Sequence, residues 1–264
     1  MPSGGLLVVL AHPDDETLVS GAMAHYAARG VPVTLLCATR GEAGEIAEGH
    51  KATPADLGEH RERELRLACD ILGVRDVRFL PYRDSGMRGT PENDDPRSLF
   101  RAAEAGVVGA IAEVMRDVRP AVVVTWDATG GYGHPDHMTI HERTTQAFER
   151  DGESAALYYA LIPAGEFGEI MQAAREEHPD AGTPGDVDDT LEMQSVPANC
   201  VLDVSDEYER KMRAMQAHGS QLGSFEIFLR VPEDLRKRMF GREHYHRVAP
   251  PVPDGVMLSD LFSG

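Results

Sequence analysis

Residues 11–16 read Ala-His-Pro-Asp-Asp-Glu and directly follow the apolar run at residues 6–10. A short, continuous apolar run is typical of a strand that is buried on both faces of a sheet. We therefore expect the strand to end in one imidazole and two neighbouring carboxylates. Such side chains bind metal ions and transfer protons, so the pattern indicates the start of a hydrolytic metal centre.

A second cluster of this kind follows another apolar run. Residues 130–137 read Gly-Gly-Tyr-Gly-His-Pro-Asp-His and come shortly after the run at 121–126. Apolar runs alternate along the chain with segments of helical periodicity, which predicts an α/β fold, a Rossmann-like three-layer structure with a mostly parallel central sheet. Ligands of such sheets bind beyond the carboxyl ends of the strands, so we expect both clusters to meet there in one active site.

The same patterns predict the positions of the elements. Strands are expected at 6–10, 31–38, 76–80, 120–126, 157–162 and 199–204, and helices at 17–29, 59–72, 97–119, 137–150 and 205–218. Two connections, 42–58 and 82–96, are rich in Gly, Pro and acidic residues. We expect them to form the walls of the active-site pocket.

The whole chain, 1–264, is expected to form one domain. Its core spans about 5–162. An acidic insertion follows at about 163–197, where we expect a mobile segment or lid. The carboxyl-terminal part, 198–264, is expected to hold a strand, a helix and a proline-containing tail.

Composition narrows the classes of partner. The formal net charge of -18 over 264 residues argues against a nucleic-acid partner, which binds through Lys and Arg. No apolar stretch has the length of a membrane span, and the first apolar run is too short for a signal peptide. The 3 cysteines are far apart and form no CxxC pair. This favours buried thiols in a reducing, cytoplasmic compartment.

Three side chains of the two clusters form a candidate metal site. His12 and Asp15 are three residues apart across a strand-to-helix turn, and His137 comes from the second cluster. Two imidazoles and one carboxylate leave a coordination position free, as a catalytic ion requires. Zn²⁺ is the expected ion, and Fe²⁺, Co²⁺ or Mn²⁺ would also suit these donors. Such an ion lowers the pKa of its water from about 15.7 towards about 7.

The remaining polar residues of the clusters suit roles in catalysis. Asp14 is expected to point away from Asp15, because adjacent side chains on an extended turn diverge, and it is the candidate general base. His134 would face the substrate and either protonate the leaving group or stabilise an oxyanion. The Tyr132 hydroxyl could complete the oxyanion site. Asp136 could accept a hydrogen bond from a ligand imidazole.

The two motifs together resemble those of the PIG-L/LmbE-like N-acetylglucosaminyl deacetylases. The resemblance covers about residues 5–160, with weaker support from Ala-His-Gly-Ser-Gln at 217–221. It implies a metal-dependent hydrolase that removes the acetyl group from an N-acetylglucosamine conjugate, a small-molecule substrate, and assembly as a homo-oligomer, a trimer or hexamer. It places metal ligands at His12, Asp15 and His137, and catalytic groups at Asp14, His134 and Tyr132.

The resemblance also implies residues of a sugar pocket. Arg61 matches an arginine that grips the substrate beside the sugar, with Arg63 as the alternative register. Asp84, in the run Arg-Asp-Ser-Gly-Met, matches an aspartate that binds a glucosamine hydroxyl. Glu45 lies in the loop after the second strand and could reach the pocket.

The loop with Asp84 and the Gly-Gly-Tyr turn most resemble the mycothiol and bacillithiol branches of the family. Mycothiol-branch members carry more sequence between this loop and the next helix than residues 89–96 provide. The difference favours a bacillithiol-type substrate, with a mycothiol-type or another N-acetylglucosamine conjugate as the alternative.

Other interpretations stay open at this point. His141 could be a fourth ligand, although helix packing is the commoner role, and His244 and His246 could line a site. A Rossmann-type nucleotide-binding protein is the alternative of another class. It is disfavoured because the first strand-to-helix turn lacks the glycines that admit a pyrophosphate. A non-catalytic interaction protein is the third possibility.

Overall fold

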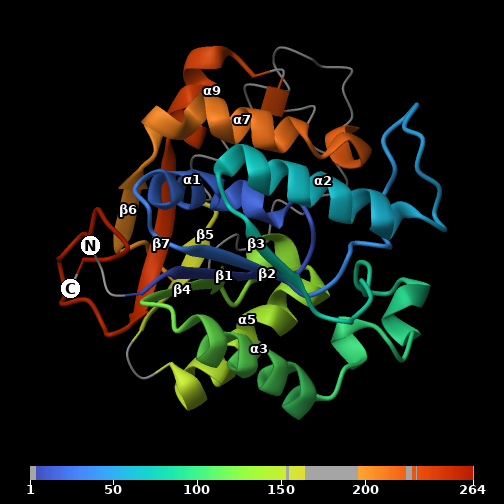
Figure 1. Ribbon diagram of the computed structural model, residues 1–264, viewed down its shortest axis with the longest axis horizontal. Helices are drawn as coiled ribbons and strands as arrows, with labels where there is room; N and C mark the ends of the chain where they lie inside the picture. Colours follow the sequence, from blue (N-terminus) through green and yellow to red (C-terminus); the bar gives the residue numbers. More distant parts are fainter. Residues whose placement is uncertain (1–3, 153–154, 164–195, 224–227, 230, 264) are drawn as a thin grey trace.

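The computed structural model describes residues 4–152, 155–163, 196–223, 228–229 and 231–263. Within these ranges seven strands form one sheet in the order β3-β2-β1-β4-β5-β7-β6 (Figure 1). Strands β1 to β5 pair in parallel, and β7 runs antiparallel to both of its neighbours. The strands are β1 Leu6–Leu10, β2 Val33–Cys37, β3 Asp76–Phe79, β4 Val122–Trp126, β5 Ala156–Leu161, β6 Cys200–Asp203 and β7 Arg242–Ala249.

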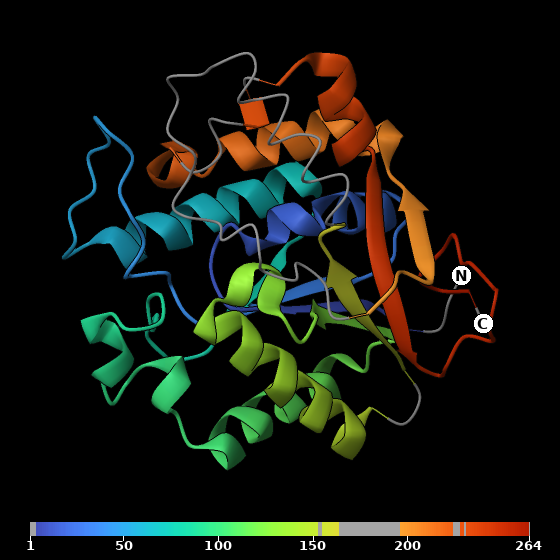
Figure 2. The same cartoon turned by 180° about the vertical axis from the view of Figure 1, so that it is seen from behind.

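Helices cover both faces of this sheet. Helices α1, α2 and α7 lie on one face and α3 and α5 on the other (Figures 1 and 2), so the predicted three-layer α/β fold is confirmed. The α-helices are α1 Ser20–Ala28, α2 Leu57–Leu72, α3 Glu104–Val118, α4 Gly130–Gly133, α5 Pro135–Asp151, α7 Tyr208–Gln216 and α9 Glu233–Phe240. Short 3-10 helices are η1 Asp15–Leu18, η2 Pro91–Asp94, η3 Leu99–Arg101, η4 Ser205–Glu207 and η5 Gly219–Gln221.

The core lies between the sheet and its two helical layers. All residues of β1, β2 and β4 are buried, which explains why these strands consist almost entirely of apolar residues. Helix α2 contributes Leu65, Ala68, Cys69 and Leu72, whose spacing places them on one buried face. Each fully buried Leu or Val side chain contributes about 1.5–3 kcal/mol to folding.

The order of the strands determines where a ligand can bind. From β1 the chain moves outward to β2 and β3, then returns to the other side of β1 to form β4 and β5. Because the direction of winding reverses between β1 and β4, the connections after these two strands diverge and leave a crevice at their carboxyl ends. The first sequence cluster directly follows β1 and the second follows β4 after residues 127–129, so the topology brings them together.

The carboxyl-terminal segment differs from its prediction. The expected tail contains α9 and the strand β7, which inserts between β5 and β6. Strand β7 has no apolar periodicity, since two of its buried positions are Glu243 and Arg247. Glu243 accepts hydrogen bonds from the N–H groups of Gly21 and Ala22 at 2.7 and 2.8 Å. Because charged residues occupy buried positions of β7, the hydropathy of the sequence does not indicate a strand there.

Several boundaries also differ. The helix expected at 97–119 begins at Glu104, because extended backbone at residues 102 and 103 separates it from η3. The helix expected at 137–150 begins at Pro135, and proline suits this first helical position because its missing N–H is not needed there. Residues 164–195, almost all of the predicted insertion, lie outside the described residues. Among the described helices none is long and apolar enough to cross a membrane.

Candidate metal centre

The turn after β1 folds the Asp15 carboxylate back onto the end of the strand. Its Oδ2 accepts hydrogen bonds from Ala11 N at 3.0 Å and from His12 N at 2.9 Å. The indole Nε1 of Trp126, at the end of β4, donates to the same oxygen at 3.2 Å. Three donors therefore fix this carboxylate, and its other oxygen faces the second cluster.

The turn after β4 depends on glycine. Gly130 and Gly131 have φ values of 61° and 71°, which L side chains rarely adopt. A Cβ on Gly130 would lie 2.7 Å from the Cβ of His137, and one on Gly131 would lie 2.8 Å from the Trp126 ring. The tight turn brings the Gly130 carbonyl to His137 Nδ1, which donates to it at 3.0 Å. His137 Nε2 is thereby left to face the first cluster.

Three potential ligand side chains converge from the two turns. His12 Nδ1 and His137 Nε2 are 3.1 Å apart, and His137 Nε2 lies 3.2 Å from Asp15 Oδ1. His12 Nδ1 lies 3.8 Å from Asp15 Oδ2. A tetrahedral zinc ion with bonds of about 2.0–2.1 Å separates its ligands by about 3.3 Å. The buried donor set of His12, Asp15 and His137 thus fits one small divalent ion.

The far side of His12 is held by carboxylates. His12 Nε2 donates to Asp136 Oδ2 at 3.1 Å and lies 3.4 Å from Asp84 Oδ1. Asp136 also accepts from the N–H of Ser85, at 2.9 Å, and from its hydroxyl. The expected contact of Asp136 with the imidazole of a candidate ligand is therefore present. A proton on Nε2 leaves the lone pair of Nδ1 pointing towards His137, as metal binding requires.

Ligand-type atoms form two overlapping groups around His12. Those of His12, His134 and His137 lie within 4.8 Å of one another, as do those of His12, Asp84 and Asp136. The second group is already joined by the hydrogen bond between His12 and Asp136. The first group shares His12 and His137 with the donor set that includes Asp15, and it is the better place for an ion.

Asp14 and Asp15 contact different partners. The backbone of Asp14 has a φ of 100° and a ψ of -22°, and its Oδ2 lies 3.0 Å from Nη2 of Arg61. Arg61 is buried on α2 and also donates to the carbonyls of Pro13 at 2.5 Å and Gly41 at 2.8 Å. Arg63 is exposed and donates to a carbonyl of its own helix. Of the two alternative registers, the structure brings Arg61 to the site.

His134 and Tyr132 pack against the two candidate ligand histidines. His134 precedes α5, and its Nδ1 accepts from the N–H of Asp136 at 3.1 Å, which leaves Nε2 as the atom able to meet a substrate. Its ring packs edge-on against His12, with the centroids 4.6 Å apart. Tyr132 is 37% exposed and packs edge-on against His137 at 5.2 Å.

Burial and the mixture of charges shift the pKa values of the group in opposite directions. Desolvation and the nearby His12 and His137 lower the pKa of His134 to about 2. The pKa of Asp14 is raised by desolvation, against the opposing effect of Arg61. Burial opposes the charge of Asp15, but His137 and His12 hold its pKa well below the ordinary value. Neighbouring groups of the site therefore differ widely in protonation.

The two residues assigned to the sugar pocket lie differently. Asp84 is buried beside His12, and its carboxylate accepts from the N–H of Gly86 at 2.8 Å and of Ala43 at 3.2 Å. Glu45 is exposed in the loop after β2, where its carbonyl accepts from Gln221 Nε2 at 2.9 Å. The structure brings Asp84 into the group and leaves the contribution of Glu45 a prediction.

Sequence reasoning missed the role of Trp126. Its indole stacks on the His137 imidazole, with centroids 4.2 Å apart and an angle of 11°, while its Nε1 binds Asp15. Its carbonyl accepts from His141 Nδ1 at 2.8 Å, so His141 supports the strand end and the structure favours its packing role. The available signal was a lone tryptophan at the end of the strand before the second cluster.

The other histidines singled out in the sequence lie on β7. His246 Nδ1 donates to the carbonyl of Pro197 at 2.7 Å at an exposed position. His244 pairs in register with Val201 of β6 and Leu161 of β5.

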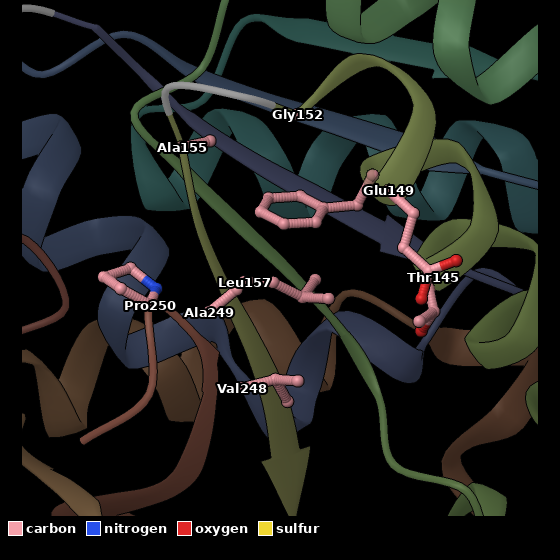
Figure 3. A pocket seen from close by; sticks show the side chains of 9 residues that line it. Thr145, Glu149, Gly152, Ala155, Leu157, Val248, Ala249 and Pro250 are labelled. Carbon is pink, nitrogen blue, oxygen red and sulfur yellow. The ribbon is translucent and has the colours of Figure 1, made fainter. Parts of the chain in front are cut away.

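A separate cavity of about 550 Å³ contains none of the cluster residues. Figure 3 shows it between the carboxyl-terminal end of α5, the start of β5 and the end of β7. The candidate centre lies at the other end of α5 and beyond the opposite end of the parallel strands. The cavity is therefore not part of the candidate centre.

Comparisons with known proteins place this chain in a family. Residues 7–148 match the family described as GlcNAc-PI de-N-acetylase, PIG-L. A 1D-myo-inositol 2-acetamido-2-deoxy-alpha-D-glucopyranoside deacetylase of Acidothermus cellulolyticus is 40% identical, and the alignment covers 98% of this chain and 94% of the relative. A protein of the same name from Geodermatophilus obscurus is also 40% identical, with 100% and 98% coverage.

Solved structures share the fold at lower identity. The 4-carboxy-2-hydroxymuconate hydratase of Pseudomonas putida is 21% identical with a TM-score of 0.64, over 96% of this chain and 99% of that one. The N,N'-diacetylchitobiose deacetylase of Pyrococcus horikoshii is 19% identical with a TM-score of 0.57, over 93% and 84%. Their different reactions show that the fold alone does not decide the chemistry. The family match and the relatives with 40% sequence identity identify the chemistry. This chain belongs to the PIG-L family and is a hydrolase of the N-acetylglucosaminyl deacetylase type.

Proposed function

We propose that this chain hydrolyses the acetamide of an N-acetylglucosaminyl inositol to give acetate and the free amine, with Zn²⁺ as its ion. The observation that carries the proposal is the convergence of His12, Asp15 and His137, with Asp14 beside them. The substrate class rests on the names of the relatives, which favour the mycothiol-type alternative over the bacillithiol-type substrate. The short segment at 89–96, on which the bacillithiol preference rested, carries less weight than similarity along the whole chain.

The three converging side chains would hold the ion. When bound, the ion supplies Lewis acidity, which polarises the amide carbonyl and acidifies the attacking water. Asp14 takes the proton of that water, and Arg61 keeps its carboxylate in place through the contact with Oδ2. The proton then passes to the departing amine, since hydrolysis of the amide consumes one water and leaves no net proton change within the protein.

His134 and Tyr132 are assigned to the developing charge on the amide oxygen. Because His134 Nδ1 accepts a backbone hydrogen bond, the neutral ring carries its proton on Nε2 and can donate it to an oxyanion or to the amine. Desolvation raises the pKa of Tyr132, so its hydroxyl remains a donor at neutral pH. Asp84, buried beside His12, is assigned to a glucosamine hydroxyl.

The turn after β1 disfavours a nucleotide-binding function. The N–H groups of Ala11 and His12, at the end of β1, are where a phosphate would bind in a Rossmann-type site. Both donate to the Asp15 carboxylate instead. A phosphate would have to displace a buried carboxylate of its own charge.

The test is amine release by the zinc-loaded protein from N-acetylglucosaminyl inositol, N-acetylglucosaminyl malate and free N-acetylglucosamine. We expect the highest kcat/KM for the inositol conjugate. Asp14→Asn should lower kcat by about 10²–10⁴-fold while the metal stays bound. Asp70→Asn, which changes an exposed carboxylate on α2, is the matched control and should keep the wild-type rate.

Two outcomes would contradict the proposal at different levels. Preference for the malate conjugate would show that the substrate class is wrong while the reaction stands. Metal binding without amine release from any of the three compounds would show that the reaction itself is wrong.

A further inference from the structure

Asp14 has a backbone conformation that its side chain disfavours. Its φ of 100° lies in the left-handed region, and among the described residues Arg119 is the only other non-glycine residue with a positive φ. An L-residue remains in this region only where its surroundings hold it there. Because the proposed function makes Asp14 the base, the groups that hold this conformation bear directly on catalysis.

Glu16 holds the backbone of Asp14. Its Oε2 accepts from the N–H of Asp14 at 2.9 Å. The Asp14 carbonyl accepts from the N–H and the hydroxyl of Thr17 at 3.0 and 2.8 Å. Glu16 is 0% exposed, so water does not compete for its carboxylate. Both polar groups next to the Asp14 Cα atom are thus bound within the turn.

His218 binds the other oxygen of Glu16 from a distant part of the chain. Its Nε2 donates to Glu16 Oε1 at 2.5 Å across 202 residues of sequence, and both side chains are fully buried. His218 lies between α7 and η5. A buried carboxylate is costly without a partner, so the His218 imidazole stabilises the Glu16 carboxylate. That carboxylate is the acceptor of the hydrogen bond from the Asp14 N–H.

The two anchors of Asp14 act on different atoms. Arg61 binds the side chain at Oδ2, whereas Glu16 binds the main chain at N. A carboxylate fixed only at its tip could still move when the peptide group behind it turned over. With both ends held, the Asp14 carboxylate has one position relative to His12 and Asp15.

We propose that Glu16 and His218 are positioning residues for Asp14, a buried carboxylate–imidazole pair that keeps the base in its left-handed conformation. This inference rests on the proposed function. Neither residue is assigned a contact with substrate, so both act through Asp14 alone.

The experiment is a double-mutant cycle on the zinc-loaded protein, with kcat, KM and metal content measured for each variant. Glu16→Ala should lower kcat by about 100-fold, the usual effect of misplacing a catalytic group by about 1 Å. KM and bound metal should stay unchanged. In the Asp14→Asn background the same change should alter the residual rate by less than about two-fold, because no base is left to position.

Further variants separate positioning from folding. Glu16→Gln keeps an oxygen acceptor for the Asp14 N–H and should restore most of kcat, and His218→Ala should act in the same direction as Glu16→Ala. If Glu16→Ala does not fold, His218→Ala takes its place in the cycle, and Glu16→Gln remains the rescue variant. Glu64→Ala is the matched control. It removes a carboxylate that accepts two hydrogen bonds from Ser220, close to His218, without touching Asp14.

Three results would overturn the inference. Equal losses of rate in the wild-type and Asp14→Asn backgrounds would show a general structural role. Loss of metal from Glu16→Ala would show that the effect passes through Asp15. Full activity of both Glu16→Ala and His218→Ala would show that Asp14 needs neither residue. An unmodified protein that releases no amine from any N-acetylglucosaminyl conjugate would instead contradict the proposed function, and this inference with it.

Discussion

At the scale of single residues, each proposed metal ligand is oriented by a hydrogen bond on the side away from the ion. His12 Nε2 donates to Asp136, and His137 Nδ1 donates to the Gly130 carbonyl. Asp15 Oδ2 accepts two backbone N–H groups and the indole of Trp126. Such contacts reduce the freedom that the ligands would lose on binding an ion, so they raise the affinity of the site.

Trp126→Phe tests the importance of this outer layer. The phenyl ring keeps much of the stacking on His137 but cannot donate to Asp15 Oδ2. We expect zinc affinity to fall by about 10–100-fold, the usual effect of removing an outer partner of a ligand. Competition with a chromophoric chelator measures the affinity. The melting temperature of the metal-free variant is the control, and unchanged affinity would show that the indole N–H does not orient Asp15.

At the scale of elements, the candidate centre depends on two turns at neighbouring strand ends. Residues 11–16 turn through a left-handed Asp14, and α4 turns through glycines with positive φ. In the second turn His134 caps α5 with its side chain and Pro135 begins the helix. The His-Pro-Asp-His run is therefore both a helix start and a set of functional side chains.

Gly130→Ala tests the second turn. The positive φ alone disfavours alanine by about 1–2 kcal/mol, and the new Cβ would meet the Cβ of His137. We expect a lower free energy of unfolding in urea and weaker zinc binding. Gly109→Ala, in the middle of α3 with open space around its Cα, is the control. It should raise stability by about 0.5–1 kcal/mol. Equal effects of the two variants would contradict the account of the turn.

The sequence predicts the elements well where burial follows periodicity. Strands β1, β2 and β4 are apolar runs, interrupted only by Thr34 in β2 and Thr125 in β4, and their parallel order places both clusters at one edge. Strand β7 could not be found in this way, because Glu243 and Arg247 occupy buried positions of the strand. The N–H groups of Gly21 and Ala22, to which Glu243 binds, lie more than 200 residues away in sequence. Only the folded structure shows them to be satisfied.

The same limit applies within the site. His12, Asp15 and His137 are predictable because each follows a strand end within a recognisable motif. Trp126 and Asp15 are 111 residues apart, and Glu16 and His218 are 202 residues apart. These pairs carry no local signal, since a hydrogen bond between distant residues leaves no periodicity in the sequence.

At the scale of the whole molecule, a buried ion pair connects the carboxyl-terminal elements to the first helix. Lys211 of α7 donates to Glu243 of β7, which also binds the start of α1 and the hydroxyl of Tyr245. Both charged side chains are 2% exposed. Removing one partner of such a buried pair lowers the free energy of unfolding far more than removing one partner of an exposed pair.

The variant Lys211→Met tests how much the buried ion pair contributes to stability. Removing the ammonium leaves the buried Glu243 carboxylate without its counter-charge, so we expect a loss of about 3–5 kcal/mol in the free energy of unfolding. Lys237→Met breaks the exposed pair with Glu233 on α9 and serves as the control. Its stability should stay close to wild type. Similar stability of the two variants in urea unfolding would contradict the structural role of the buried pair.

The three thiols report on the integrity of the same core. Cys37, Cys69 and Cys200 are free and buried, as the sequence predicts, and burial raises the pKa of each thiol, that of Cys200 to about 12. Since the thiolate is the reactive form, we expect no reaction of the native protein with Ellman's reagent at pH 8. In denaturant all 3 thiols should react. Rapid reaction of the native protein would show that the core is open.

The most direct test of the candidate centre is a crystal structure of the zinc-loaded protein with anomalous data at the zinc absorption edge. We expect one peak at about 2.0–2.2 Å from His12 Nδ1, His137 Nε2 and an oxygen of Asp15. A peak on the other side of His12, between Asp84 and Asp136, would contradict the account, because those carboxylates are assigned to hold the ring and the sugar. So would a protein that binds no zinc after reconstitution.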